Sequence, residues 1–145
     1  MYPTRITHLI LYVSTNGTTI ATFCNKTDMK KILIIEDEGD MCLLLNLLLN
    51  QNEMVVDHVK TLSGAKKFLE TERPSLILLD NRLPDGLGID FLTYLKKNFP
   101  EVKIIMISGV DISVSDVALE IGADTFLRKP FTKKQLQDSI SNLLN

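Results

Sequence analysis

The sequence predicts an α/β protein with a doubly wound parallel sheet of five strands flanked by five helices. From Met29 onward, short apolar runs alternate with helical patterns of roughly ten residues, which is typical of βαβ units. Three of the apolar runs contain no alternating polar residues, as expected for strands that helices cover on both faces. With 145 residues and 45% hydrophobic content, the chain has the size and composition of one soluble globular domain.

Each strand is expected in a run of β-branched and aliphatic residues. The five runs are KILII (31–35), MVV (54–56, extendable to Val59), SLILL (75–79), KIIMI (103–107) and TFL (125–127). The helices are expected between and after these runs, at 39–51, 61–71, 87–98, 112–121 and 132–144.

The ends of two helices carry local sequence patterns that are typical of helix termini. Gly122 stands where a helix C-terminus favours a residue with a left-handed backbone. Thr132 and Gln135 have the spacing of a capping box, and Phe131 with Leu136 has the spacing of a hydrophobic staple. The last helix is therefore expected to begin at Thr132.

Residues 1–28 differ from the rest of the chain. Two β-prone runs, ITHLILYV (6–13) and TTIATF (18–23), flank an Asn16–Gly17 pair that favours a hairpin turn. A signal peptide is disfavoured because the apolar run is short and is interrupted by His8. We therefore expect residues 1–28 to be an extension, either a β-hairpin or a product of start-codon choice, and residues 29–145 to form the functional domain.

Composition excludes several classes of function. A net charge of −2 and a pI near 5.7 give no general attraction to nucleic acid or to anionic membranes. No apolar run is long enough to span a bilayer. Cys24 and Cys42 lack the spacing of a disulfide framework or a zinc site, which fits a cytoplasmic protein, and His58 is expected to be an exposed strand residue without a metal partner.

Five chemically reactive residues follow strand ends and are expected at one edge of the sheet. Glu36 and Asp37 follow the first strand, Asp80 the third, Ser108 the fourth and Lys129 the fifth. In doubly wound sheets the functional crevice lies beyond the carboxyl ends of the strands. Neighbouring carboxylates oppose each other by roughly 1 to 4 kcal/mol, so a cation such as Mg²⁺ is expected to neutralise them. A lysine and a serine nearby indicate a phosphoryl group, with Asp80 as its nucleophile.

Four separated motifs, KKILIIEDE, LILLDNRLPDGLGIDFL, MISG and GADTFLRKPF, resemble the receiver domain of two-component response regulators. The resemblance covers roughly residues 29–145, and the motifs agree with that family in order and spacing. It implies a flavodoxin-like, CheY-like fold with strand order 2-1-3-4-5.

The resemblance also implies a magnesium-dependent phosphoacceptor site. Asp80 would accept the phosphoryl group, and Mg²⁺ or Mn²⁺ would be held by Asp37 directly and by Glu36 through water. Asp80 itself and the backbone carbonyl of Arg82 would complete the protein ligands.

Three further residues take roles from the same resemblance. Ser108 would be the switch hydroxyl that hydrogen-bonds the phosphoryl group, and Phe126 the aromatic side chain that rotates inward behind it. Lys129 would contact a phosphoryl oxygen, and the Lys129–Pro130 peptide bond would be cis, as it usually is in the family. From the residues alone, a simple core side chain is an alternative interpretation of Phe126.

The function so implied is a signalling switch rather than an enzyme. A sensor histidine kinase or a histidine phosphotransfer protein would donate the phosphoryl group, and the surface around the fourth helix and fifth strand would report it. The sequence names no downstream target, and it leaves open whether phosphorylation drives dimerisation. No output domain follows the last helix, so the chain is expected to be a stand-alone regulator or a receiver excised from a longer protein.

The sequence leaves three alternative functions open. A flavodoxin-like nucleotide or flavin module would need a phosphate-cradling loop where EDEGD stands. An aspartate-nucleophile phosphatase would need an acid where Arg82 stands, and a degenerate receiver would no longer accept phosphate.

The first predicted helix contains the run MCLLLNLLLN, which is apolar nearly all round. This pattern indicates either unusually deep burial or a docking face for a partner helix bundle.

Overall fold

The computed structural model describes residues 10–13, 19–22, 29–49, 54–109 and 112–145. The predicted Asn16–Gly17 turn lies outside these ranges, but the strands on either side of it, β1 (Ile10–Val13) and β2 (Thr19–Thr22), pair antiparallel. Among the described residues, no helix combines the length and the apolar character needed to cross a bilayer.

The main sheet has five parallel strands, as predicted. They are β3 (Lys31–Ile35), β4 (Val55–Val59), β5 (Leu76–Asp80), β8 (Lys103–Ser108) and β9 (Thr125–Arg128). Their spatial order is β4-β3-β5-β8-β9, which is the expected order 2-1-3-4-5 when only these strands are numbered. The second strand is longer than the core MVV run, because it continues to Val59.

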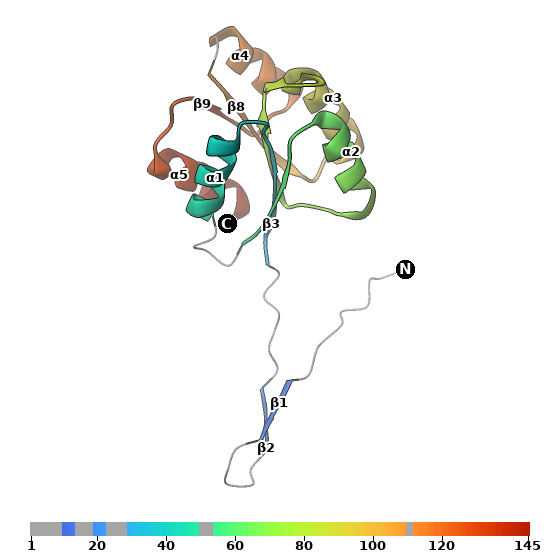
Figure 1. Cartoon of the computed structure of the whole chain (residues 1–145), viewed down its shortest axis with the longest axis vertical. Helices are drawn as coiled ribbons and strands as arrows, with labels where there is room; N and C mark the ends of the chain where they lie inside the picture. Colours follow the sequence, from blue (N-terminus) through green and yellow to red (C-terminus); the bar gives the residue numbers. More distant parts are fainter. Residues whose placement is uncertain (1–9, 14–18, 23–28, 50–53, 110–111) are drawn as a thin grey trace.

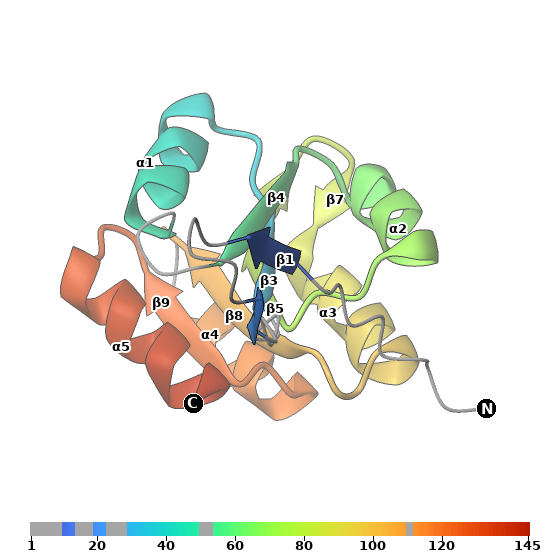
Figure 2. The same ribbon diagram turned by 90° about the horizontal axis from the view of Figure 1, so that it is seen from below.

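Five helices cover the two faces of this sheet. They are α1 (Gly39–Leu49), α2 (Leu62–Thr71), α3 (Gly88–Asn98), α4 (Ile112–Ile121) and α5 (Lys133–Leu144). Helices α1 and α5 pack on one face, and α2, α3 and α4 pack on the other (Figures 1 and 2). The first helix is described only to Leu49, so the end predicted at residue 51 lies outside the described residues.

The apolar strands supply both halves of the core. In β3, Leu33 and Ile35 face the cluster under α2 to α4, whereas Ile32 and Ile34 face the cluster under α1 and α5. All four side chains are fully buried. Because successive side chains of a strand point to opposite faces, a strand buried on both faces must be apolar at every position.

The predicted helix ends are confirmed. Thr132 caps α5, its hydroxyl accepts from the backbone N–H of Gln135, and the Gln135 side chain accepts from the backbone N–H of Thr132. Phe131 packs against the core cluster that contains Leu136. Gly122 follows α4 with a φ of 124°, the left-handed conformation that its position predicted.

One element was not predicted. Two short antiparallel strands, β6 (Arg82–Leu83) and β7 (Gly86–Leu87), form a hairpin between β5 and α3. This hairpin leads the chain from Asp80 at the end of β5 into α3, so it lies directly beside the candidate functional residues.

Candidate functional site

The carboxyl ends of four neighbouring strands bring the predicted residues to one edge of the sheet. Glu36 and Asp37 follow β3, Asp80 ends β5, Ser108 ends β8 and Lys129 follows β9. Backbone hydrogen bonds fix this arrangement, because the N–H of Lys129 donates to the carbonyl of Ser108 at 2.9 Å. The peptide bond between Lys129 and Pro130 is cis, as expected.

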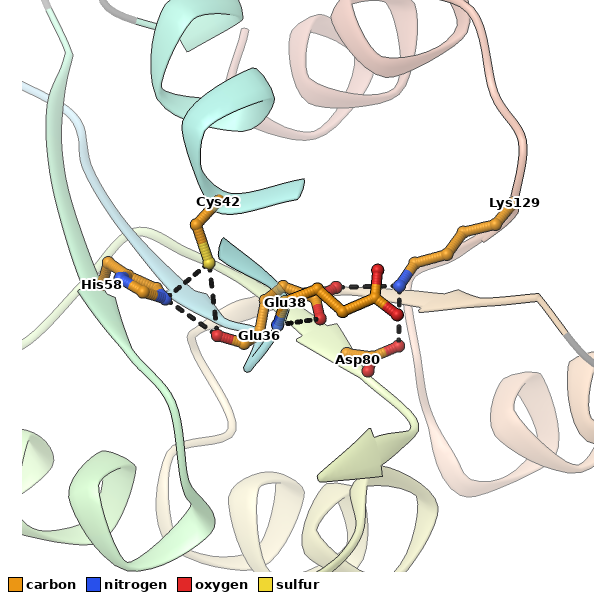
Figure 3. Close-up of polar contacts among 6 residues, drawn as sticks. All are labelled: Glu36, Glu38, Cys42, His58, Asp80 and Lys129. Carbon is orange, nitrogen blue, oxygen red and sulfur yellow. Dashed lines mark hydrogen bonds and ion pairs between the residues drawn. The ribbon is translucent and has the colours of Figure 1, made fainter. Parts of the chain in front are cut away.

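Lys129 joins two of the acids across the sheet edge. Its Nζ lies 2.8 Å from Oε2 of Glu36 and 3.3 Å from Oδ1 of Asp80 (Figure 3). Both acids are buried, with 2% of Glu36 and 7% of Asp80 exposed. Burial alone would lower the pKa of Lys129, but the hydrogen bond to Glu36 and the two negative charges raise it, so the ammonium stays charged.

Asp80 lies in surroundings that disfavour its charged form. Its pKa is raised to about 6, first by burial and then by the negative charge of Glu36, while Lys129 acts in the opposite direction. One lysine therefore does not compensate for the burial and the neighbouring carboxylate. The site favours additional positive charge next to Asp80.

The acidic residues also have the geometry of a cation site. Glu36, Asp37 and Asp80 each offer a carboxylate oxygen, and these three atoms lie within 4.8 Å of one another. Asp37 is exposed, so this cluster opens to solvent on one side. Carboxylate oxygens together with access to water suit Mg²⁺, which retains several waters and takes few protein ligands. The residues present therefore fit a magnesium ion.

Because the pKa of Asp80 is raised, replacing this acid with a neutral residue is expected to stabilise the folded protein, by an amount that depends on pH. The folded state holds the Asp80 proton up to about pH 6, whereas the unfolded chain releases it near 3.8, so the ionised carboxylate destabilises the folded state at higher pH. In a metal chelator, Asp80→Asn should raise the free energy of unfolding at pH 7.5 by an amount on the order of 2 kcal/mol. Thermal melts should show that this gain in stability shrinks as the pH falls from about 6 towards 4. A gain that is constant with pH would contradict the raised pKa of Asp80.

The segment after Asp80 is held tightly against α3. Asn81 is buried, its side-chain oxygen accepts from the N–H of Ile89 at 3.0 Å, and its carbonyl accepts from the N–H of Gly88 at 2.8 Å. A Cβ at Gly88 would lie 2.2 Å from the carbonyl oxygen of Asp80. Glycine at this position is therefore what allows α3 to approach the backbone of Asp80 so closely.

Asp85, between β6 and β7, contacts the start of α2. Its Oδ1 accepts from the N–H of Leu62 at 2.9 Å and its Oδ2 from the N–H of Ser63 at 3.0 Å. These backbone hydrogen bonds lower the pKa of Asp85. The carboxylate thus caps α2 from the β6–β7 hairpin and ties that hairpin to the helix.

The remaining predicted residues are placed consistently with their expected roles, which stay predictions. Ser108 is buried at the end of β8, and Phe126 is half-buried on β9, where it pairs in register with Met106 and packs against the core. Arg82 is exposed on β6, two residues after Asp80. Its role as a metal ligand through the backbone carbonyl stays a prediction.

Two site residues were missed by the sequence reading. His58 was expected to be exposed, and this is wrong, because it is half-buried and its Nε2 lies 2.8 Å from the carbonyl oxygen of Glu36. The buried thiol of Cys42 lies 3.3 Å from the same oxygen. Burial and then the charge of Glu36 raise the pKa of this thiol, which keeps it protonated. Nothing in the sequence pairs these two residues, since the contact joins α1 to β4.

Comparison with known proteins agrees with this geometry. A family model described as the response regulator receiver domain matches residues 32–141. The chain is 37% identical over 115 residues to the transcriptional regulatory protein BasR of Escherichia coli, covering 79% of this chain and 52% of BasR. It is 31% identical over 116 residues to the response regulator protein PilR of Pseudomonas aeruginosa, covering 79% of this chain and 26% of PilR. The chain therefore spans only part of the length of these relatives.

Solved structures show the same fold. The beryllofluoride-activated receiver domain dimer of NtrC4 matches with a TM-score of 0.76 and 31% identity, over 79% of this chain and 96% of that one. A CheY-like receiver domain protein from Methanospirillum hungatei matches with a TM-score of 0.75 and 28% identity, over 79% of this chain and 93% of that one. The matching family model, the order of the strands and the acidic edge all agree, and the chain belongs to the response regulator receiver domain family.

Proposed function

We propose that this receiver domain accepts a phosphoryl group on Asp80 in a reaction that depends on Mg²⁺ or Mn²⁺. The observation that carries the proposal is the position of the Asp80 carboxylate. It lies 3.3 Å from the ammonium of Lys129 and within 4.8 Å of carboxylate oxygens from Glu36 and Asp37. A carboxylate nucleophile with a fixed positive charge and cation ligands close to it is what such a transfer would require, and this arrangement supports the proposal.

The proposed transfer is a substitution at phosphorus. A carboxylate oxygen of Asp80 forms the new P–O bond as the P–N bond of a phosphohistidine breaks, and the bonding electrons leave with the imidazole of the donor. A bound divalent ion would supply charge neutralisation for the phosphoryl oxygens. Lys129 is within reach of Asp80 and is held charged, so it contributes a second positive charge beside the acceptor.

In this proposal the chain is a phosphoacceptor rather than an enzyme that turns over a separate substrate. A sensor histidine kinase or a histidine phosphotransfer protein is the proposed donor, and the cytoplasm is the proposed location of the reaction. Ser108 and Phe126 are the proposed switch residues, because Ser108 ends β8 at the acceptor edge and Phe126 lies on the adjacent strand β9. The beryllofluoride-activated NtrC4 receiver domain is a dimer. By analogy, a phosphorylation-dependent dimer is also proposed for this chain.

The proposal is tested by incubating the protein with acetyl phosphate and Mg²⁺ and measuring its intact mass. A gain of one phosphoryl group is expected, and a chelator should diminish it. No gain in mass would favour a degenerate receiver that has lost phosphate acceptance. A yellow protein with bound flavin would instead favour the flavodoxin-like module.

The exposed face of α1 is the proposed docking surface for the phosphoryl donor. Leu43, Leu44 and Leu47 are 61%, 43% and 59% exposed, whereas Cys42, Leu45 and Leu49 are buried. Of the two sequence alternatives, deep burial therefore does not apply to these three leucines within the part of the chain that the structure describes. An apolar cluster of this kind on a surface helix is suited to a partner helix bundle.

A double substitution on this face should distinguish docking of the kinase from the phosphorylation reaction at Asp80. Leu43→Gln with Leu47→Gln is expected to slow phosphotransfer from the cognate kinase by roughly 10-fold or more, because apolar anchors dominate such interfaces. Labelling by acetyl phosphate should be unchanged, since neither leucine contacts the acids. Val117→Gln on α4, a position that is 46% exposed, is the matched control for adding a polar side chain elsewhere. An equal loss in both assays would show that the leucines act on folding instead.

A further inference from the structure

Glu36 is held through each of its polar groups. Its N–H donates to the carbonyl of Val59 at 3.1 Å. Its Oε1 accepts from the N–H of Glu38 at 3.1 Å, and its Oε2 accepts from Lys129. Its carbonyl oxygen is contacted by Cys42 and His58. Asp37, the next residue, is exposed.

The contact on the carbonyl of Glu36 comes from two different elements. The thiol of Cys42 on α1 donates to this oxygen at 3.3 Å, and Nε2 of His58 on β4 lies 2.8 Å from it (Figure 3). A carbonyl oxygen has two lone pairs and only accepts hydrogen bonds, so it can serve both donors, and Nε2 of His58 must carry its proton. The sulfur and Nε2 are also hydrogen-bonded to each other at 2.7 Å, with the N–H of Nε2 shared between the sulfur and the carbonyl while the thiol donates to the carbonyl. We call Cys42 and His58 the carbonyl clamp.

The clamped carbonyl belongs to the peptide group that joins Glu36 to Asp37. Its plane sets the direction in which the chain leaves β3 and therefore where the Asp37 carboxylate can reach. Without the two donors, the Glu36 carbonyl would remain buried beside α1 with its main partners removed, and the peptide would be free to rotate. The position of the Asp37 carboxylate relative to those of Glu36 and Asp80 therefore depends on the orientation of this peptide.

We propose that Cys42 and His58 are positioning residues that orient the Glu36–Asp37 peptide for binding of a divalent cation. The inference rests on the proposed function, because it assigns these two residues to the same Mg²⁺ site. Groups that hold metal ligands in place through hydrogen bonds commonly change affinity by one to two orders of magnitude when they are removed. The clamp acts through Glu36 and does not contact the ion.

Two pairs of variants separate loss of the donor from loss of the side chain. Cys42→Ala and His58→Leu remove the donors, whereas Cys42→Ser and His58→Gln keep an O–H or N–H near the same position. Leu45→Val on α1 and Val56→Ala on β4 are matched controls, because they disturb packing on the same two elements without touching the carbonyl. Thermal melts in chelator establish which variants are folded.

The first measurement is the dissociation constant for Mg²⁺ by calorimetry. Cys42→Ala and His58→Leu should each weaken Mg²⁺ binding by roughly 10-fold. The Ser and Gln variants and the two packing controls should remain near the unsubstituted protein. Acetyl phosphate labelling of the two donor-removing variants should recover at saturating Mg²⁺, since the nucleophile and Lys129 are unchanged.

The second measurement is amide hydrogen exchange of Glu38 in metal-free protein. This N–H is bonded to the Glu36 side chain, so it should exchange faster when the clamp is removed. Unchanged Mg²⁺ affinity in folded Cys42→Ala would overturn the inference, even if His58→Leu fails to fold, because the thiol makes its own bond to the carbonyl. Failure of the unsubstituted protein to bind Mg²⁺ is a different result, and it would overturn the proposed function as well.

Discussion

Asp80→Asn is expected to abolish the gain of a phosphoryl group from acetyl phosphate and Mg²⁺. An amide oxygen is a poor nucleophile, and within the part of the chain that the structure describes Glu36 is the one other acid that contacts Lys129. Glu36 is buried and already bonded to Lys129 and to the N–H of Glu38, so its oxygens are not free to attack. Intact mass spectrometry should therefore show no phosphorylated species, while the variant remains folded.

The matched control for this prediction is Asp138→Asn. Asp138 is an exposed residue on α5 that pairs with Lys134, far along the chain from the acidic edge, and its substitution should leave phosphorylation unchanged. A phosphoryl group that still appears on Asp80→Asn would move the acceptor to another carboxylate, with Asp37 as the first to test because it is the exposed acid of the cluster.

Gly88→Ala is expected to be strongly destabilising for a reason that is entirely local. The added Cβ would lie 2.2 Å from the carbonyl oxygen of Asp80 and 3.1 Å from the Cα of Asn81, and both atoms belong to the backbone. Either the end of β5 or the start of α3 must move. Overpacking of this kind costs about 1–3 kcal/mol and occasionally more. Thermal or urea unfolding should show the loss, and phosphoryl uptake should fall because Asp80 is displaced.

Gly39→Ala provides the control for replacing a glycine at the start of a helix. A Cβ there would have nothing within 4 Å, so the substitution should leave stability close to that of the unsubstituted protein. If Gly88→Ala melted at the same temperature as Gly39→Ala, the close approach of α3 to Asp80 would be wrong.

Most of the fold could be predicted because a strand that is buried on both faces appears in the sequence as a continuous apolar run. The run LILL (76–79) in β5 is buried at every position, and an apolar run is what such a strand requires. The cap of α5 could be predicted for a similar reason, since Thr132 and Gln135 are three residues apart and their contact is local. The β6–β7 hairpin could not, because two strands of two residues each are too short to show a period.

The candidate site also has a part that the sequence predicted and a part that it did not. The sequence by itself determined which acids, serine and lysine reach the sheet edge, because each follows a strand and parallel strands end on the same side. Only the tertiary structure decided their partners: Lys129 lies closer to Glu36 than to Asp80, and Asp85 caps α2. It also decided that Cys42 and His58 meet on one carbonyl oxygen. Periodicity records which face of an element is buried, whereas contacts between elements depend on how a helix lies across its neighbouring strands, and no spacing along the chain encodes that.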